Sequence, residues 1–406
     1  FGTSADASQS LFNLSSFSMN SVTKFFCLVA TLSLICLTSF ANIATAPGDP
    51  GHPGDFDLRD GDRVVYLGDT LIEREQYHGW LDVMFSSRYP DFDITFRNLG
   101  WAGDTPDGKS RLGLSLLQAG KEPDDEGWHQ LVNQLEEAKP TVVVLGYGMA
   151  SSFEGEAGVS EFRENYKKLR DKILEIAPDV RFIHVGPILP ENIFQVLKGL
   201  RPKSGNTSPE ELSLYHEQLA HYQTLTKISG ISSEIESDEY IKHIETLKEN
   251  DKREELRGIL RKFKLPKSGL WFLDLTVDND GRPLTSNGIH LNAAGYRAFA
   301  ESFEMQLFGT EGAWRTSPHT EALRQAVLRK NEAFFNRSRP ANMAYIFGFR
   351  KREQGNNAVE VLEFDKFVAA EDANIAKLRH LLPVEITVPT QRLTNRVLEY
   401  TPQALP

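Results

Sequence analysis

The segment VVYLGDTLIE, Val64 to Glu73, changes character at its centre. Its first four residues are apolar, with the β-branched and aromatic side chains that are typical of a buried strand. Gly68 and Asp69 then form a turn, and the residues that follow begin a helical pattern. The segment therefore predicts a strand, a tight turn and a helix, with the hydroxyl of Thr70 at the junction. Thr70 is either a nucleophile or the N-cap of that helix.

Short apolar runs alternate with amphipathic stretches along most of the chain. The expected strands share a continuous apolar character and cover residues 64–67, 93–98, 141–145, 181–185 and 271–275. The expected helices share apolar positions at helical spacing and cover residues 71–88, 128–138, 161–176 and 293–308. Fully apolar strands separated by helices are typical of a parallel sheet that is covered on both faces. We therefore expect an α/β fold with a central parallel sheet.

Two regions depart from this alternation. A charge-rich segment at about 201–267 contains the capping box Ser208-Pro209-Glu210-Glu211 and two sets of apolar positions at helical spacing. It predicts a helical hairpin on the rim of the sheet, with a structural or a lid-forming role. Residues 313–406 begin with a helix near Pro318 and continue into a tail rich in Arg and Asn. They predict an extension that packs on the core rather than a separate domain.

The N-terminal region resembles an export signal in its pattern. An apolar run covers residues 25–40 behind Lys24 and ends in small residues, which is typical of a secretory signal peptide. An uncleaved membrane anchor is the alternative. We assign 1–46 to upstream residues and this signal, 47–59 to a Pro- and Gly-rich linker, and 60–312 to the main domain. The expected location is secreted or periplasmic, with only a transient membrane contact. Cys27 and Cys36 both lie in the signal, so we expect a mature chain without a thiol.

The charge and histidine patterns argue against two classes of function. The chain has a net charge of −11 and no basic tract, so a nucleic acid is not an expected partner. Its ten histidines show no metal-ligand spacing such as HExxH, so we expect no metal site.

Four short segments lie where an open parallel sheet gathers its ligands, at the ends of its strands. They are GDTL at 68–71, NLGWAGDT at 98–105, GYGMASSFEG at 146–155 and SNGIHLNAAGY at 286–296. Their order and spacing resemble the SGNH, or GDSL, hydrolase superfamily over about 60–308, and the second and fourth segments are the specific parts. The resemblance implies a flavodoxin-like three-layer α/β/α sandwich that hydrolyses carboxylic esters of small molecules or glycans. It also implies that no metal or organic cofactor is needed.

Carried over position by position, the resemblance assigns five roles to this chain. The nucleophilic serine of the family falls at Thr70, and its catalytic histidine falls at His290. The oxyanion-hole glycine falls at Gly103, whose backbone N–H could act together with that of Thr70. Ala150 stands where the family has an oxyanion-hole asparagine. Asn287 stands where the family has the aspartate that orients the histidine.

These departures weaken the predicted site. The methyl group of threonine restricts χ1 and crowds the attacking oxygen. Loss of one oxyanion donor costs about 10²–10³ in rate in a protease, and Asn in place of the orienting Asp costs about 10⁴. Candidates for substrate contacts on the same loops are Trp101, Tyr147, Phe153 and Ser151, and either Ser151 or Ser152 is a candidate for the missing donor. Three hypotheses follow: an exported ester hydrolase, a protein that binds an acylated glycan or a protein partner without turning it over, or a scaffold that acts through the Arg- and Asn-rich tail and the helical insertion.

Overall fold

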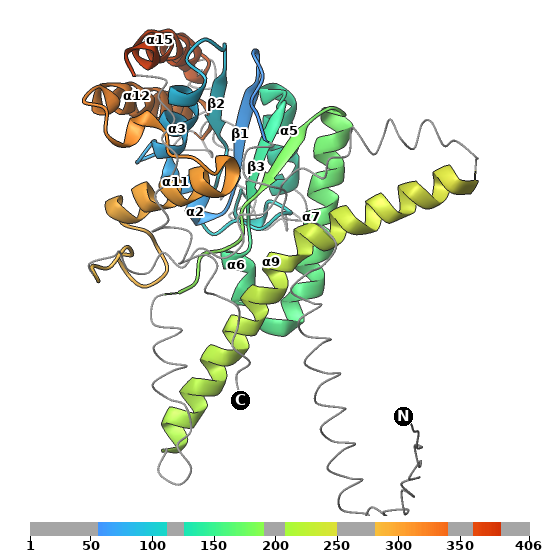
Figure 1. The fold of residues 1–406 in the computed structure, drawn as a ribbon. Coiled ribbons are helices and arrows are strands. Elements are labelled where there is room, and N and C mark those ends of the chain that lie inside the picture. The colour runs from blue at the N-terminus through green and yellow to red at the C-terminus, as the bar shows by residue number, and fades with distance from the viewer. Residues whose placement is uncertain (1–55, 112–125, 191–207, 250–280, 340–359, 383–406) are drawn as a thin grey trace, which may run out of the picture. The chain divides into compact units, whose positions relative to one another are not determined.

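The structure is a computed structural model that describes residues 56–111, 126–190, 208–249, 281–339 and 360–382 (Figure 1). The predicted signal peptide and the predicted fifth strand at 271–275 lie outside these residues. Among the helices of the described residues, none is long and apolar enough to cross a membrane.

The central feature is a parallel sheet whose strands follow the spatial order β2-β1-β3-β4 (Figure 1). Its strands are β1 (Arg63–Gly68), β2 (Thr95–Asn98), β3 (Val142–Gly146) and β4 (Arg181–His184). β1 lies between β2 and β3, and Gly68 at its end pairs with Gly146 at the end of β3. The strands predicted at 64–67, 93–98, 141–145 and 181–185 are confirmed. This pairing brings the loops that follow β1 and β3 together.

Helices cover both faces of the sheet. They are α3 (Trp80–Arg88), α5 (Glu126–Ala138), α7 (Gly155–Ile176), α9 (Pro209–Glu249), α11 (Ala293–Phe308) and α12 (Thr320–Ser338). Because alternate strand residues point to opposite faces, Val64 and Tyr66 pack with side chains of α3, α11 and α12. Val65 and Leu67 pack on the other face with side chains of α5, α7 and α9. The predicted three-layer α/β/α sandwich is therefore confirmed.

The helix predicted at 71–88 is in fact two helices, α2 (Thr70–Glu75) and α3. The chain turns at Gly79, whose φ of 70° lies in the left-handed region that favours glycine. The Glu75 carboxylate accepts hydrogen bonds from the backbone N–H groups of Gly79 and Leu81. It therefore satisfies the amide of Leu81 at the start of α3, whereas the Gly79 N–H also donates to the backbone carbonyl of Glu75 at 2.8 Å. Apolar residues continue at helical spacing through the break, so the pattern did not reveal it.

The inserted segment also differs from its prediction. The capping box is confirmed, because Ser208 and Glu211 each donate a backbone N–H to the other's side chain, at 2.9 and 3.1 Å. However, α9 runs without a turn from Pro209 to Glu249, so the predicted hairpin has no turn in this range. The remainder of the predicted second helix lies outside the described residues. α9 packs on the sheet through Ile228 and Ile231.

The C-terminal region reaches the core through α12 and α15 (Phe364–Leu378). Val327 of α12 and Ile375 of α15 are buried in the same apolar cluster as α3. The buried ammonium of Lys330 on α12 pairs with the buried carboxylate of Asp82 on α3. Separating such a pair would leave two uncompensated charges, so it holds α12 on α3. The domain boundary at 313 stays a prediction. Short helices complete the described chain: η1 (Lys109–Arg111), α6 (Met149–Ser152), η2 (Ala313–Arg315) and η3 (Arg379–Leu381).

Candidate active site

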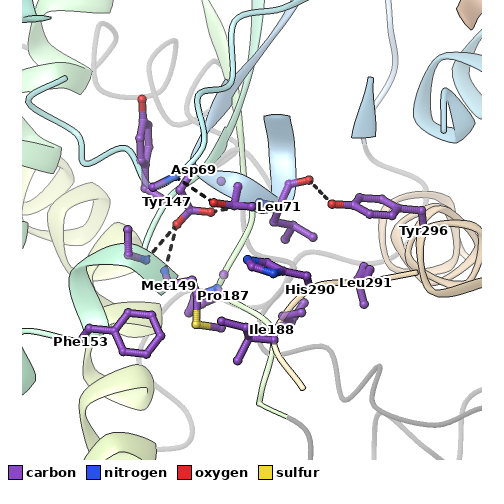
Figure 2. A pocket seen from close by; sticks show the side chains of 16 residues that line it. Asp69, Leu71, Tyr147, Met149, Phe153, Pro187, Ile188, His290, Leu291 and Tyr296 are labelled. Atoms are coloured by element: carbon purple, nitrogen blue, oxygen red, sulfur yellow. Dashed lines mark hydrogen bonds between the residues drawn. The ribbon is translucent and has the colours of Figure 1, made fainter. Parts of the chain in front are cut away.

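A pocket of about 300 Å³ lies at the ends of β1, β3 and β4 (Figure 2). Its lining comes from distant parts of the chain: Asp69, Thr70, Leu71, Gly103, Gly146, Tyr147, Met149, Ala150, Phe153, Gly186, Pro187, Ile188, Ile289, His290, Leu291 and Tyr296. The structure thus brings together Thr70, Gly103, Ala150 and His290, the residues on which the sequence placed the nucleophile, the oxyanion hole and the base.

Asp69 ties the loops that follow β1 and β3 to each other. It is the N-cap of α2, and its Oδ1 accepts a hydrogen bond from the backbone N–H of Leu71 at 3.3 Å. Its Oδ2 accepts from the N–H groups of Gly148, Met149 and Ala150 at 3.0–3.3 Å. Burial raises the pKa of Asp69 to about 6, although these backbone donors oppose the rise. A single carboxylate therefore fixes the two loops, after β1 and after β3, that line the pocket.

Thr70 is not the N-cap of the helix. Asp69 has that role, and Thr70 is the first residue of α2. The Thr70 Oγ1 instead accepts a hydrogen bond from the backbone N–H of Gly103 at 2.9 Å. Within the described part of the chain, neither the hydroxyl proton nor the backbone N–H of Thr70 has an acceptor. The capping alternative is therefore wrong, and Thr70 offers two donors in the pocket.

Asn287 decides the tautomer of His290. Its Oδ1 accepts hydrogen bonds from the backbone N–H groups of His290 and Ile289, at 3.0 and 3.4 Å. This leaves its Nδ2 facing the Nδ1 of His290 at 2.9 Å. An amide nitrogen can only donate, so Nδ1 accepts and the proton of the neutral ring lies on Nε2. The aspartate of a serine triad does the opposite: it accepts from Nδ1–H and leaves Nε2 free to act as a base.

His290 is held neutral but is not joined to Thr70. Burial and the positive charge of Arg74 lower the pKa of His290. Both residues line the pocket, but the described structure contains no hydrogen bond between them. The resting site therefore presents donors, Nε2–H of His290 and the two of Thr70, rather than an assembled nucleophile and base.

Gly103 lies in a loop that is fixed by hydrogen bonds to Ser110 and Arg111. Its φ of 67° lies in the left-handed region that favours glycine. Space is not the reason for glycine here, because a Cβ at this position would lie 3.8 Å from its nearest neighbour, the Ser110 hydroxyl. The next residue, Asp104, is buried and accepts hydrogen bonds from the Nε of Arg111 at 2.8 Å and the N–H of Ser110 at 3.1 Å. The Ser110 hydroxyl donates to the carbonyl of Gly103 at 2.7 Å. The Gly103 N–H is consequently aimed at Thr70.

The third predicted oxyanion donor is absent at position 150. Ala150 has no side-chain donor, and its backbone N–H donates to Asp69. Neither Ser151 nor Ser152 lines the pocket. The Ser152 hydroxyl donates to the carbonyl of Met149 at 2.7 Å and accepts from the Nε2 of His221. The predictions that Ser151 or Ser152 replaces the missing donor and that Ala150 serves the oxyanion hole therefore have no support in this geometry.

Two of the three predicted aromatic contacts, Trp101 and Tyr147, are engaged elsewhere. Trp101 does not line the pocket, and the guanidinium groups of Arg339 and Arg111 lie 3.8 and 5.3 Å from the centre of its ring. Tyr147 contributes to the lining, but Figure 2 shows its ring directed away from His290. Its hydroxyl donates to Asp104 at 3.4 Å. Stacking of a sugar on either ring is therefore not supported.

Sequence reasoning found Phe153 but missed the rest of the apolar wall of the pocket. Figure 2 shows Met149, Ile188 and Leu291 near the ring of His290, and Phe153 at the rim is 62% exposed. Ile188 follows β4, so the rule that ligands gather at strand ends could have found it. Among the described residues, no group of three His, Cys, Asp or Glu side chains could hold a metal ion.

Comparisons with known proteins give only distant likenesses. No protein-family model matches the chain, and no curated protein matches it. The similar solved structures include a gut microbial diltiazem-metabolizing enzyme (16% identity, TM-score 0.33), matched over 63% of this chain and 49% of that chain, about half of its length. They also include a GDSL-like lipase from Bacteroides thetaiotaomicron (15% identity, TM-score 0.28, 61% and 87% covered). A family two carbohydrate esterase from Clostridium thermocellum, in complex with cellohexaose, has 13% identity and a TM-score of 0.30, with 62% and 65% covered. Likenesses with TM-scores this low do not establish the function of this chain, so the evidence for its function is the geometry of the site.

Proposed function

We propose that the chain is an ester hydrolase in which Thr70 is the nucleophile. One observation carries this proposal: Thr70, Gly103 and His290, which lie far apart in the sequence, line one pocket at the ends of the strands. Hydrolysis by acyl transfer needs a nucleophilic hydroxyl, a base and donors for the developing oxyanion, and these residues can supply all of them.

The reaction can be written on these atoms. The Thr70 Oγ1 attacks the ester carbonyl and transfers its proton to Nε2 of His290, which returns a proton to the departing alcohol. The oxyanion accepts from the N–H groups of Gly103 and Thr70. Water then attacks the acyl-threonine and gives a proton to Nε2 of His290; the bond between the acyl carbon and Oγ1 breaks, His290 returns the proton to Oγ1, and the acid is released. The Gly103 N–H donates to Thr70 Oγ1 in the resting site and must donate to the oxyanion during the reaction. This exchange is short, because Oγ1 and the oxyanion are bonded to the same carbon once Oγ1 has attacked.

Asn287 makes the first step slow. Nε2 can accept a proton only if the ring carries its proton on Nδ1, where it would face the Nδ2 donor of Asn287. Turning the amide would remove its Oδ1 from the N–H groups of His290 and Ile289. In a Ser-His-Asp protease the equivalent conflict lowers the rate about 10⁴-fold. We therefore propose a slow hydrolase.

The pocket favours a short acyl group. Its volume of about 300 Å³ is at the lower end of small-molecule sites, and its wall at Met149, Ile188 and Leu291 is apolar. We propose an ester of a short acyl chain, with a glycan as one candidate for the alcohol part. We also propose that the protein acts after export, on the basis of the apolar run behind Lys24.

A second function is favoured by the Asn287–His290 contact. Three donors that face a small apolar pocket suit an acceptor oxygen that is bound and not attacked. The alternative is therefore a protein that binds an acylated ligand through its carbonyl oxygen.

Trapping of the acyl intermediate separates the two functions. The full chain is incubated with 4-nitrophenyl acetate, and the peptide that contains Thr70 is weighed by mass spectrometry. We expect acetylation of Thr70, faster in Thr70→Ser at the same position and absent in His290→Ala. A folded wild type that binds the ester but neither acquires an acetyl group nor releases 4-nitrophenolate would refute the hydrolase and leave the binding protein.

A further inference from the structure

The C-terminal end of α12 reaches the loop that carries Gly103. Arg339 is the first residue after α12, and its guanidinium carbon lies 3.8 Å from the centre of the Trp101 ring. Its Nη1 lies 3.3 Å from Oε1 of Glu73. The Arg339 side chain is only 19% exposed, and that of Glu73 is 8% exposed. Both contacts are therefore largely protected from water.

These contacts join the two elements that meet at the candidate nucleophile. Glu73 follows Thr70 by three residues on α2, and Trp101 precedes Gly103 by two residues on the loop. The only hydrogen bond of the Gly103 N–H within the described residues is the one to Thr70 Oγ1. Arg339 thus bridges α2 and the loop close to this bond.

Other contacts also hold this loop, including the hydrogen bond from the Ser110 hydroxyl to the Gly103 carbonyl, and Arg339 adds a link from the Trp101 ring to α2. At its start, the Asn98 amide donates to the carbonyl of Ile72 at 2.7 Å, and at its end Asp104 is buried against Arg111. Between these anchors, Trp101 donates its backbone N–H to the carbonyl of Gly68 at 2.9 Å. Its indole ring stacks on Arg339 at 3.8 Å and lies farther from Arg111, at 5.3 Å, so a change at position 339 removes the nearer of the two cations that hold the ring.

We propose that Arg339, in the C-terminal extension, is a positioning residue of the pocket. It fixes Trp101 against Glu73 and thereby sets the Gly103 N–H relative to Thr70. The catalytic part of this role rests on the proposed hydrolase, whereas the positional part does not. The Arg- and Asn-rich extension would then complete the site as well as cover the sheet.

The planar guanidinium is suited to this role. It can stack on the indole and donate to a carboxylate at the same time, which the compact ammonium of lysine does not reproduce. A desolvated cation–π contact and a partly buried ion pair together correspond to a change of about tenfold or more in the equilibrium constant for opening of the loop that carries Gly103.

The test compares Arg339→Ala and Arg339→Lys with Arg337→Ala in the full chain. Arg337 lies two residues earlier, in the last turn of α12, and pairs with Glu137 of α5 and Asp365 of α15 instead of α2 and the loop. Amide hydrogen exchange of residues 99–104 is measured first, because it does not depend on activity. We expect exchange about tenfold faster in Arg339→Ala, an intermediate rate in Arg339→Lys, and the wild-type rate in Arg337→Ala.

Steady-state hydrolysis of 4-nitrophenyl acetate gives the second readout. If the oxyanion donor is displaced, kcat of Arg339→Ala falls about tenfold while KM changes little. Unchanged exchange at 99–104, or exchange that rises equally in every segment, overturns the proposal. If the wild type hydrolyses nothing, the proposed hydrolase fails, and the exchange data alone decide the role of Arg339.

Discussion

The Thr70 side of the pocket is built from buried groups, whereas the His290 side is a largely exposed turn. Asp69 and Asp104, which fix the loops around Thr70 and Gly103, are 2% and 0% exposed. Asn287 is exposed and His290 is half-buried. Their turn is closed by the N–H of Ser286, which donates to the carbonyl of His290 at 2.7 Å, and by the bridge between Thr285 and Leu291.

This difference in burial explains why the site tolerates an amide at position 287 but depends on the carboxylate at position 69. Loss of the Asp69 carboxylate would leave several buried N–H groups without a partner, so the fold itself depends on it. An amide at position 287 keeps the Oδ1 contacts to the backbone of the turn and alters only the partner of the His290 ring. The geometry of the site is therefore maintained while the position of one proton changes.

The largest expected effect is on the His290 side. Asn287→Asp should raise the hydrolysis of 4-nitrophenyl acetate by up to about 10⁴-fold, because a carboxylate accepts from Nδ1–H and frees Nε2. The measurement is the release of 4-nitrophenolate by Asn287→Asp and by Asn287→Asp combined with His290→Ala. The second variant should remain at the buffer rate. A folded Asn287→Asp variant with no gain would mean that the tautomer is not what limits the site.

The next effect is on the Thr70 side and on stability. Asp69→Ala should lower the free energy of unfolding by about 3 kcal/mol, because it leaves the N–H groups of the 148–150 loop unpaired. Asp69→Asn, which keeps one acceptor oxygen, should lose less. Urea denaturation at pH 7 gives both values. A loss in Asp69→Ala no larger than that of an exposed residue such as Asn287→Ala would show that the two sides are held alike.

The pH dependence provides an internal check on Asp69. Its pKa is about 6 in the folded protein, above the value of the unfolded chain, so folding favours the protonated form. Its contribution to stability is complete below about pH 4 and is lost as the pH rises through 6. The free energy of unfolding of the wild type, measured relative to Asp69→Asn, should therefore fall between pH 4 and pH 6.

The sequence predicted the sheet and the convergence of the site loops, but not how protons are distributed there. Apolar runs and strand ends depend on local composition, so β1 followed directly from the sequence, whereas the expectation that Thr70 and His290 share one pocket came from the resemblance of four short segments to the SGNH family. Asp69 caps α2 through a local bond to Leu71, but its second oxygen holds the distant 148–150 loop, which no local pattern contains. The engagement of Trp101 by Arg339 likewise arises from a tertiary contact that no local pattern contains.

The smallest effect concerns the charge that Arg74 places near His290. The pKa of His290 is lowered first by burial and then by Arg74. Arg74→Gln removes the second cause, so the pKa of His290 should rise, and protonation should begin at a higher pH than in the wild type. Arg324→Gln is the matched control, because Arg324 lowers the pKa of His78 and is not among the causes at His290. The measurement is an NMR titration of the His290 ring, assigned by its loss in His290→Ala, so it requires no activity.

The ¹⁵N shifts in the same spectra report the tautomer of His290 at neutral pH, and we expect the proton on Nε2. If the ring instead carries its proton on Nδ1, the Asn287 amide is reversed and Nε2 is already free to act as a base. The contrast between the two sides of the pocket would then disappear, and the gain expected for Asn287→Asp would disappear with it.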